Sequence, residues 1–204
     1  MMRKLLIGAF VAASVLVAAC DGSNSTLTAP DATLAKSGSS GSGSDAPTFL
    51  SASSDATAST TVTFYAKQGE DRMGEIFTDG SSGGNGDRIV RLRVKKDAQI
   101  VLPNGTKLAK GDSVLITMHV IDQTTLATDF QPSGLKFNGK QTAILTMYYG
   151  HTNAATTPSL ESQLAIWVQE VTGGVWKKLS STVSTTLDEV QSAIPGFSNY
   201  VIAY

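Results

Sequence analysis

The chain has 204 residues, of which 16 are lysine or arginine and 17 are aspartate or glutamate, so its formal net charge at pH 7 is −1. Such a balance lacks the basic excess that nucleic-acid-binding domains use, and we expect no nucleic acid partner. The single cysteine, Cys20, excludes a disulfide framework within the chain and a zinc site built on cysteine pairs.

The first twenty residues predict export and lipid attachment. Arg3 and Lys4 precede an apolar run over residues 5–19, which is the pattern of a secretory signal peptide. That run is shorter than the roughly 20 residues that a membrane-spanning helix needs. Residues 17–20 read Val-Ala-Ala-Cys and resemble a bacterial lipobox, in which the thiol of Cys20 receives diacylglycerol and the signal is cut before it.

The mature protein is therefore expected to be a lipoprotein anchored to the cell envelope by diacylglycerol and palmitate chains on Cys20. Each buried CH₂ contributes about 0.8 kcal/mol, and stable anchoring needs more than one acyl chain. Cleavage after residue 19 also removes two basic residues, which leaves 14 of the 16 Lys+Arg against 17 Asp+Glu. The choice between the inner and the outer membrane stays open.

Residues 20–60 form a linker by composition. They are rich in serine, glycine and threonine and cannot bury enough apolar surface to offset the entropy of ordering, so a flexible tether is expected. Phe49 and Leu50 are its large apolar residues near the domain, where we expect local docking at most. The folded domain is placed at residues 61–204.

Within that domain, apolar residues alternate with polar ones in short segments, which predicts β-strands. Glycine, asparagine and proline separate the segments, and no stretch repeats with a helical period. Residues 68–87 are polar and glycine-rich and are interpreted as a loop. The pattern predicts an all-β fold, an antiparallel β-sandwich. In chain order the predicted strands cover residues 61–66, 89–95, 99–102, 113–122, 143–149, 164–168, 175–179, 187–194 and 197–204.

Four segments carry a resemblance to a known family. They are VLPNGT at 101–106, FQPSGLKF at 130–137, VWKKL at 175–179 and FSNYVIA at 197–203. In this order they resemble the Val-Pro-Pro-Gly-Ala turn, the Pro-x-Gly-Leu-x-Phe segment, the Trp-Leu hairpin and the closing strand of ZU5 domains. Residues 99–204 therefore look like a ZU5 domain, a β-sandwich found in netrin receptors, ankyrins and bacterial lipoproteins. The resemblance implies an interaction or structural role without catalysis.

The same resemblance makes the bond between Phe197 and Ser198 a candidate for self-cleavage. Some ZU5 domains cut themselves there, when the serine hydroxyl attacks the preceding carbonyl carbon and the resulting ester is hydrolysed. The histidine that precedes this pair in the family is Gly196 here, in a turn that would relax strain at the bond. We expect a closing strand that fills the core, with self-cleavage as the alternative.

Two aromatic residues are candidates for a ligand platform. Trp167 is out of phase with Ile166 and Val168 in its predicted strand, and Tyr148 is out of phase with Leu145 in its own. Two outward rings on neighbouring strands could bind a sugar or a partner protein. The alternative, which we favour, is that the second face of the strand is also covered.

The remaining candidates for chemistry are weak. The glycine-rich residues 79–87 offer oxygen ligands for calcium but lack the spacing of an EF-hand, so we interpret them as a turn. His119 and His151 stand in no Ser-His-Asp order with a nucleophile elbow. We expect no catalytic residue, no cofactor and no metal. The partner, an envelope protein or a glycan, is not identified by the sequence.

Overall fold

The computed structural model describes residues 46–54, 61–78, 86–139 and 142–204. They belong to one compact unit, Ser44–Tyr204. The predicted signal peptide, the predicted lipidation site Cys20 and the linker as far as residue 45 lie outside the described residues. So do residues 79–85, which form most of the candidate calcium loop.

The described residues form thirteen β-strands and one short helix. The elements are β1 (Thr61–Lys67), β2 (Arg72–Phe77), β3 (Arg88–Val94), β4 (Gln99–Val101), β5 (Ser113–Asp122), β6 (Ala127–Gln131), β7 (Lys136–Asn138), β8 (Ala143–Tyr148), α1 (Pro158–Glu161), β9 (Ala165–Gln169), β10 (Trp176–Lys178), β11 (Ser181–Ser184), β12 (Glu189–Ile194) and β13 (Asn199–Ala203).

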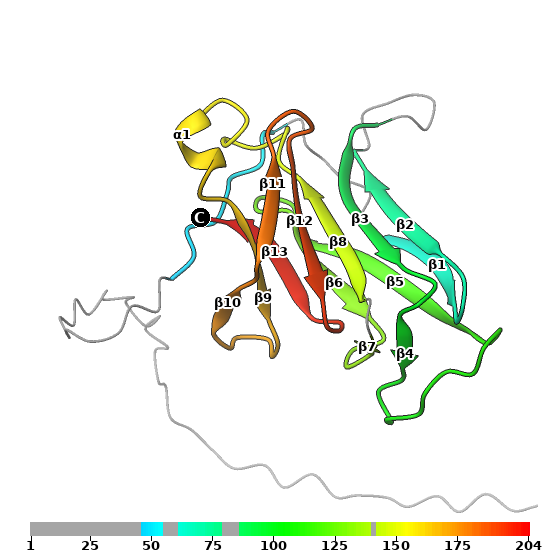
Figure 1. Cartoon of the computed structure of the whole chain (residues 1–204). Coiled ribbons are helices and arrows are strands. Elements are labelled where there is room, and N and C mark those ends of the chain that lie inside the picture. Colours follow the sequence, from blue (N-terminus) through cyan, green and yellow to red (C-terminus); the bar gives the residue numbers. More distant parts are fainter. Residues whose placement is uncertain (1–45, 55–60, 79–85, 140–141) are drawn as a thin grey trace, which may run out of the picture. The chain divides into compact units, whose positions relative to one another are not determined.

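Two antiparallel sheets make up the domain, and a two-stranded ribbon, β4-β7, accompanies them. One sheet has the strand order β1-β5-β6-β13-β9-β10, and the other has the order β11-β12-β8-β3-β2. Figure 1 shows them as two layers, with β8 and β3 in one and β5, β6 and β13 in the other. The prediction of an all-β, antiparallel, sandwich-like fold is confirmed.

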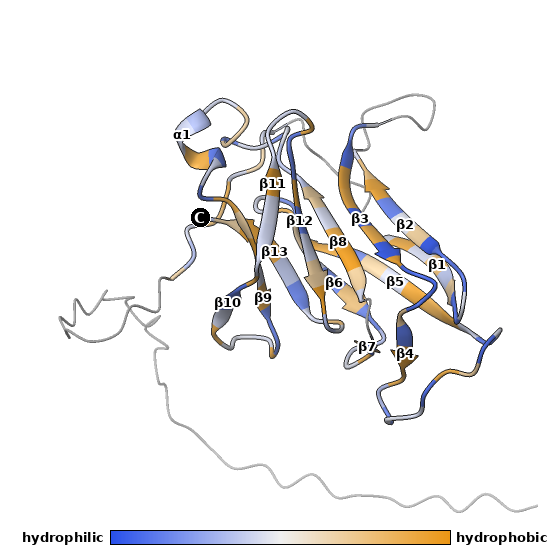
Figure 2. Cartoon of the chain, in the orientation of Figure 1, coloured by the Kyte–Doolittle hydropathy of each residue, from blue (hydrophilic) through white to orange (hydrophobic). Residues whose placement is uncertain are grey.

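The main core lies between the two sheets, because one face of each strand is apolar. Val90, Leu92 and Val94 point inward from β3 and are almost fully buried, as their alternation predicts. From the opposite sheet, Ile116 and Met118 belong to the same cluster. Figure 2 shows hydrophobic residues alternating with polar ones along the strands. His119, out of phase with this set on β5, is exposed.

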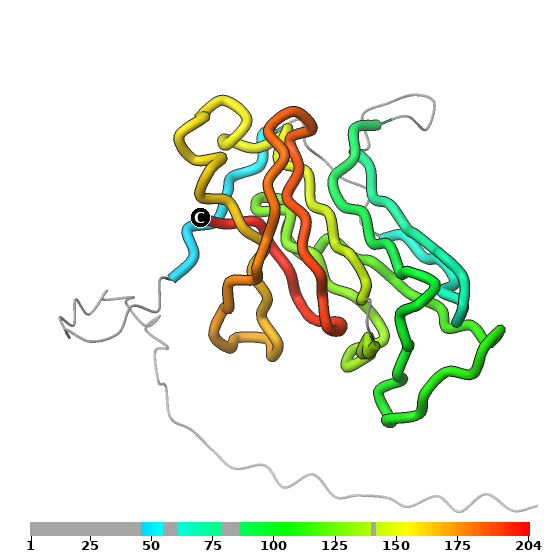
Figure 3. Tube along the Cα trace, in the orientation of Figure 1, coloured from blue at the N-terminus to red at the C-terminus, as the bar shows by residue number. Residues whose placement is uncertain are grey.

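The folded unit begins earlier than Thr61. The N-terminal strap, residues 46–54, runs beside the C-terminus (Figure 3), and Leu50 on it is 1% exposed within the main core. Backbone hydrogen bonds join the strap to three parts of the domain. Thr48 exchanges two with Tyr204 (3.0 and 3.2 Å), the Ala52 N–H donates to Thr124 O (2.7 Å), and the Ser53 N–H donates to His151 O (2.8 Å).

The predicted boundary at residue 61 is therefore corrected. Two adjacent apolar residues, Phe49 and Leu50, anchor a segment whose composition is otherwise that of a linker. Leu50 enters the core, and Phe49 packs edge-on against Trp176 with ring centroids 5.5 Å apart. Composition averaged over the whole stretch hides such a short anchor.

The composition of residues 68–87, which is polar and glycine-rich, predicts a single loop. This prediction is wrong, because β2 lies within these residues. Gly74 and Ile76 occupy the core-facing positions of β2, while Met73 faces solvent. A Cβ on Gly74 would collide with the Phe64 ring, which fills the space that a side chain would take. A glycine at an inward position removes the apolar signal from which a strand is predicted.

The closing strand is confirmed as β13, which pairs with β9 over its full length. Tyr200 is buried in the main core, and Phe197 packs against Phe130 and Phe137 with ring centroids 5.5 and 5.3 Å apart. The Tyr200 hydroxyl donates a hydrogen bond to the carbonyl oxygen of Gly196, four residues earlier. Burial raises the pKa of this hydroxyl well above its usual range.

Candidate functional site

A row of residues that is polar except at its last position, Trp176, crosses the outer face of the six-stranded sheet. The strand register places His119 opposite Asp129, Asp129 opposite Asn199, Asn199 opposite Gln169, and Gln169 opposite Trp176. Residues directly opposite each other in an antiparallel pair point to the same face. Five strands thus contribute one residue each to a continuous row that faces away from the core.

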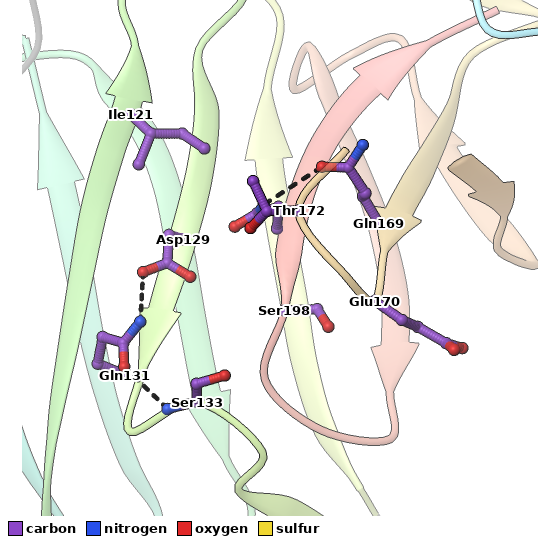
Figure 4. A pocket seen from close by; sticks show the side chains of 9 residues that line it. Ile121, Asp129, Gln131, Ser133, Gln169, Glu170, Thr172 and Ser198 are labelled. Atoms are coloured by element: carbon purple, nitrogen blue, oxygen red, sulfur yellow. Dashed lines mark hydrogen bonds between the residues drawn. The ribbon is translucent and has the colours of Figure 1, made fainter. Parts of the chain in front are cut away.

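The middle of this row opens into a hollow of about 320 Å³ between β6 and the β9–β10 turn. Pairing between β13 and β6 extends over only two residue pairs, Asn199 with Asp129 and Tyr200 with Thr128. Beyond them the two strands separate. The lining, drawn in Figure 4, consists of Ile121, Asp129, Gln131, Ser133, Gln169, Glu170, Thr172, Ser198 and Asn199.

On the β6 side, hydrogen bonds hold the polar groups in place. Gln131 Nε2 donates to Asp129 Oδ2 (2.7 Å), and the Ser133 backbone N–H donates to Gln131 Oε1 (2.9 Å). These two contacts fix the Gln131 side chain at both ends of its amide. They leave the second carboxylate oxygen of Asp129 and the Ser133 hydroxyl for a ligand.

On the opposite side, the amides of β13 and β9 are connected in the same way. Asn199 Nδ2 donates to Gln169 Oε1 (3.4 Å), and Gln169 Nε2 donates to the carbonyl oxygen of Gly174 (2.9 Å). Glu170 extends away from Asp129 in Figure 4 and forms an ion pair with Lys177 (3.1 Å). Asp129 is therefore the carboxylate that faces the open space.

Ser198 lies in the lining of this hollow, although sequence reasoning singled it out for another reason. Within the described part of the chain, no hydrogen bond joins its hydroxyl to a histidine or a carboxylate. The preceding residue, Phe197, donates its N–H to Leu135 O (2.8 Å). At Gly196, where self-cleaving ZU5 domains carry histidine, a Cβ would lie 2.6 Å from Leu135 O. The backbone at this position has no room for that side chain.

Trp167 faces away from the main core, as its phase predicts, but it is not exposed. It is 4% exposed and belongs to a second apolar cluster, against which Trp176 packs. Its indole N–H donates to Ala203 O (3.3 Å), and Lys178 Nζ lies 5.8 Å from the centroid of its ring. The outward aromatic is thus covered from β10, which corrects its placement in an open platform. The cluster consists of Ala127, Ala165, Trp167, Val201 and Ala203.

Tyr148 lies in the other sheet, on β8, so the structure does not bring it together with Trp167 on β9. It is half-buried beneath Arg91, whose guanidinium carbon is 5.6 Å from the ring centroid. Arg91 Nε in turn donates to Glu75 Oε1 (2.7 Å), which also accepts from Arg88 Nε (2.9 Å). Burial raises the pKa of Tyr148, and the charge of Arg91 offsets part of the rise.

His151 lies away from the hollow, at the start of the loop after β8. Its Nε2 atom is 2.9 Å from Asp87 Oδ2, and its carbonyl oxygen accepts the hydrogen bonds of Ser53 on the strap. Among the residues described, no group of three or more His, Cys, Asp or Glu is arranged to hold a metal ion. Calcium binding at residues 79–87 stays a prediction, since most of that loop lies outside the described residues.

Comparison with known proteins finds no matching family model, no matching curated protein and no matching solved structure. In the described part of the chain, none of the helices has the length and apolar character needed to span a membrane. The function is therefore inferred from the residues of the site itself.

The residues that line the hollow were missed at the sequence level, with the exception of Ser198. The alternation in β9 places Gln169 on the outer face, but nothing in the sequence indicates that Asn199 and Asp129 stand beside it. Those neighbours are far apart in the chain, and only the register of three strands joins them. An unusually polar outer face on two predicted strands would have been the available signal.

Proposed function

We propose that this chain is a lipid-anchored lipoprotein of the bacterial cell envelope, and that its β-sandwich is a non-catalytic interaction module. The anchor is supported by the basic residues, apolar run and lipobox that end at Cys20. The tether is supported by the serine- and glycine-rich composition of the residues that precede the strap.

The observation that carries the interaction role is the hollow on the six-stranded sheet. Its polar side chains are held by one another, yet Asp129, Ser133 and Asn199 keep atoms free for a ligand. Side chains that are already ordered lose less entropy when a partner binds. A surface of this kind is suited to recognition.

A non-catalytic role is proposed because the hollow lacks the parts of a nucleophilic site. A serine nucleophile needs a base within hydrogen-bond reach. No hydrogen bond of this kind to Ser198 occurs in the described ranges, and His119 at the end of the row is separated from Asn199 by β6. Self-cleavage between Phe197 and Ser198 is the alternative.

A ZU5-like character of residues 99–204 belongs to the same proposal. It is supported by the positions of the four resembling segments, which lie at β4 and its turn, from the end of β6 into β7, around β10, and in β13 with the two residues before it. Fold likeness does not fix function, so the binding role rests on the hollow and not on the family.

Two measurements test the proposal. Growth with an alkyne analogue of palmitate should label the wild type and leave Cys20→Ser unlabelled, and equal labelling of both would contradict the anchor. A photo-crosslinking amino acid at Thr172, on the rim of the hollow, should capture an envelope component in living cells. The same amino acid at the exposed Asp97 is the control, and equal capture from both positions would contradict the assigned surface.

A further inference from the structure

The hollow on the six-stranded sheet has a lining whose charge restricts the ligands it can accept. Its nine lining residues include two carboxylates, Asp129 and Glu170, and no lysine, arginine or histidine. Glu170 is paired with Lys177 outside the lining, whereas no ion pair involves Asp129 among the residues described. An anionic ligand would meet a negative charge with no opposite charge to offset it.

The polar groups of the lining provide both donors and acceptors. Carboxamides supply an acceptor oxygen and two donor hydrogens, hydroxyls supply both functions, and the Asp129 carboxylate accepts only. A ligand that satisfies such a mixture must also donate and accept at closely spaced positions. The hydroxyl groups of a sugar ring do so, because each hydroxyl donates one hydrogen bond and accepts others.

Two further features fit a sugar ring. The volume of about 320 Å³ lies at the lower end of the range of about 300–1,000 Å³ for small-molecule sites, which suits one or two rings. Ile121, 46% exposed, gives the lining an apolar wall against which the C–H groups of a ring can pack. The amides of Gln131 and Gln169 are already fixed by hydrogen bonds at both ends.

We propose that this hollow binds a neutral saccharide, with Asp129, Asn199 and Ser133 as the principal contacts. The inference rests on the proposed function as an interaction module and specifies its ligand class. It also replaces the platform of Trp167 and Tyr148 as the place where a sugar would bind. Binding in an open hollow is expected to be of about millimolar affinity, because few atoms of the ligand are enclosed.

The test is saturation-transfer difference NMR on the full-length lipoprotein in a detergent without a sugar headgroup. The probes are neutral trisaccharides of glucose, galactose, mannose and N-acetylglucosamine, with trigalacturonic acid as the anionic comparison. At about 10 mM, above the expected Kd, at least one neutral probe should receive saturation and trigalacturonic acid should not.

Variants locate the binding in the hollow. Asp129→Ala should raise the Kd about tenfold, which corresponds to 1.4 kcal/mol. Thr172→Ala, on the exposed turn, should raise the Kd about threefold. Asp97→Ala removes an exposed carboxylate elsewhere and should leave the Kd unchanged. Thr172→Ala keeps the test valid if Asp129→Ala does not fold, because Thr172 is exposed.

The saccharide assignment is overturned if no neutral probe binds, if trigalacturonic acid binds best, or if the hollow variants bind as tightly as the wild type. Should the NMR test fail while crosslinking from Thr172 persists, the hollow recognises another ligand class and the interaction role stands. Failure of both experiments would remove the hollow as a binding surface.

Discussion

The N-terminal strap should contribute to the stability of the domain through Leu50. Leu50 is 1% exposed, so Leu50→Ala removes a side chain that is buried in the core between the sheets. Replacing a buried leucine by alanine costs about 2–5 kcal/mol, from lost transfer free energy and the cavity that remains. This is a large part of the roughly 5–15 kcal/mol that stabilises a whole domain.

The matched control is Leu187→Ala, because Leu187 is 61% exposed and undergoes the same chemical change. Both variants are compared with the wild type by urea denaturation of a chain that begins at Asp21. Leu187→Ala should change the free energy of unfolding by less than about 0.5 kcal/mol. If Leu50→Ala is equally mild, the strap is not part of the folded unit and the linker extends to residue 60.

The end of the chain gives four further predictions, each measured by denaturation. Gly196→Ala should destabilise the domain by about 1–3 kcal/mol, because the added Cβ would lie 2.6 Å from Leu135 O. An unchanged free energy of unfolding would show that the segments around Gly196 and Leu135 separate readily. Tyr200→Phe should cost about 0.5–1.5 kcal/mol, because it removes the hydrogen bond from this hydroxyl to the carbonyl oxygen of Gly196. A Tyr200→Phe variant as stable as the wild type would contradict the role of that hydrogen bond. Removal of residues 197–204 should unfold the domain, because each large side chain buried there contributes about 1.5–3 kcal/mol to stability. A truncated chain that melts like the wild type would contradict the role of the closing strand. Ser198→Ala should leave stability unchanged, and a clear loss would show a role for its hydroxyl that the described contacts do not include.

Strands with a regular apolar alternation could be predicted from sequence, and those without it could not. In β3, β5 and β8 the inward residues are apolar, so both the strand and its core face follow from the pattern. In β2 the inward Gly74 carries no apolar signal, and β11 has Val183 as its one apolar residue. Both strands are held by pairing with neighbours that are distant in sequence.

The candidate site depended on information that a single strand does not contain. Alternation in β9 correctly assigns Trp167 and Gln169 to the outer face. It does not show that Trp176 and Lys178 on β10 cover Trp167. Nor does it show that Gln169 remains at the edge of a hollow. Which outer-face residue is covered is decided by the register of the next strand and by the strap, because Phe49 packs against Trp176.

The central claim, a lipid-anchored module that does not cut itself, is tested most directly by the intact mass of the protein isolated from its native membrane. We predict a single species that begins at Cys20, carries diacylglycerol on that residue and is intact between Phe197 and Ser198. An unacylated chain would contradict the anchor. A pair of fragments that end at Phe197 and begin at Ser198 would contradict the non-catalytic role.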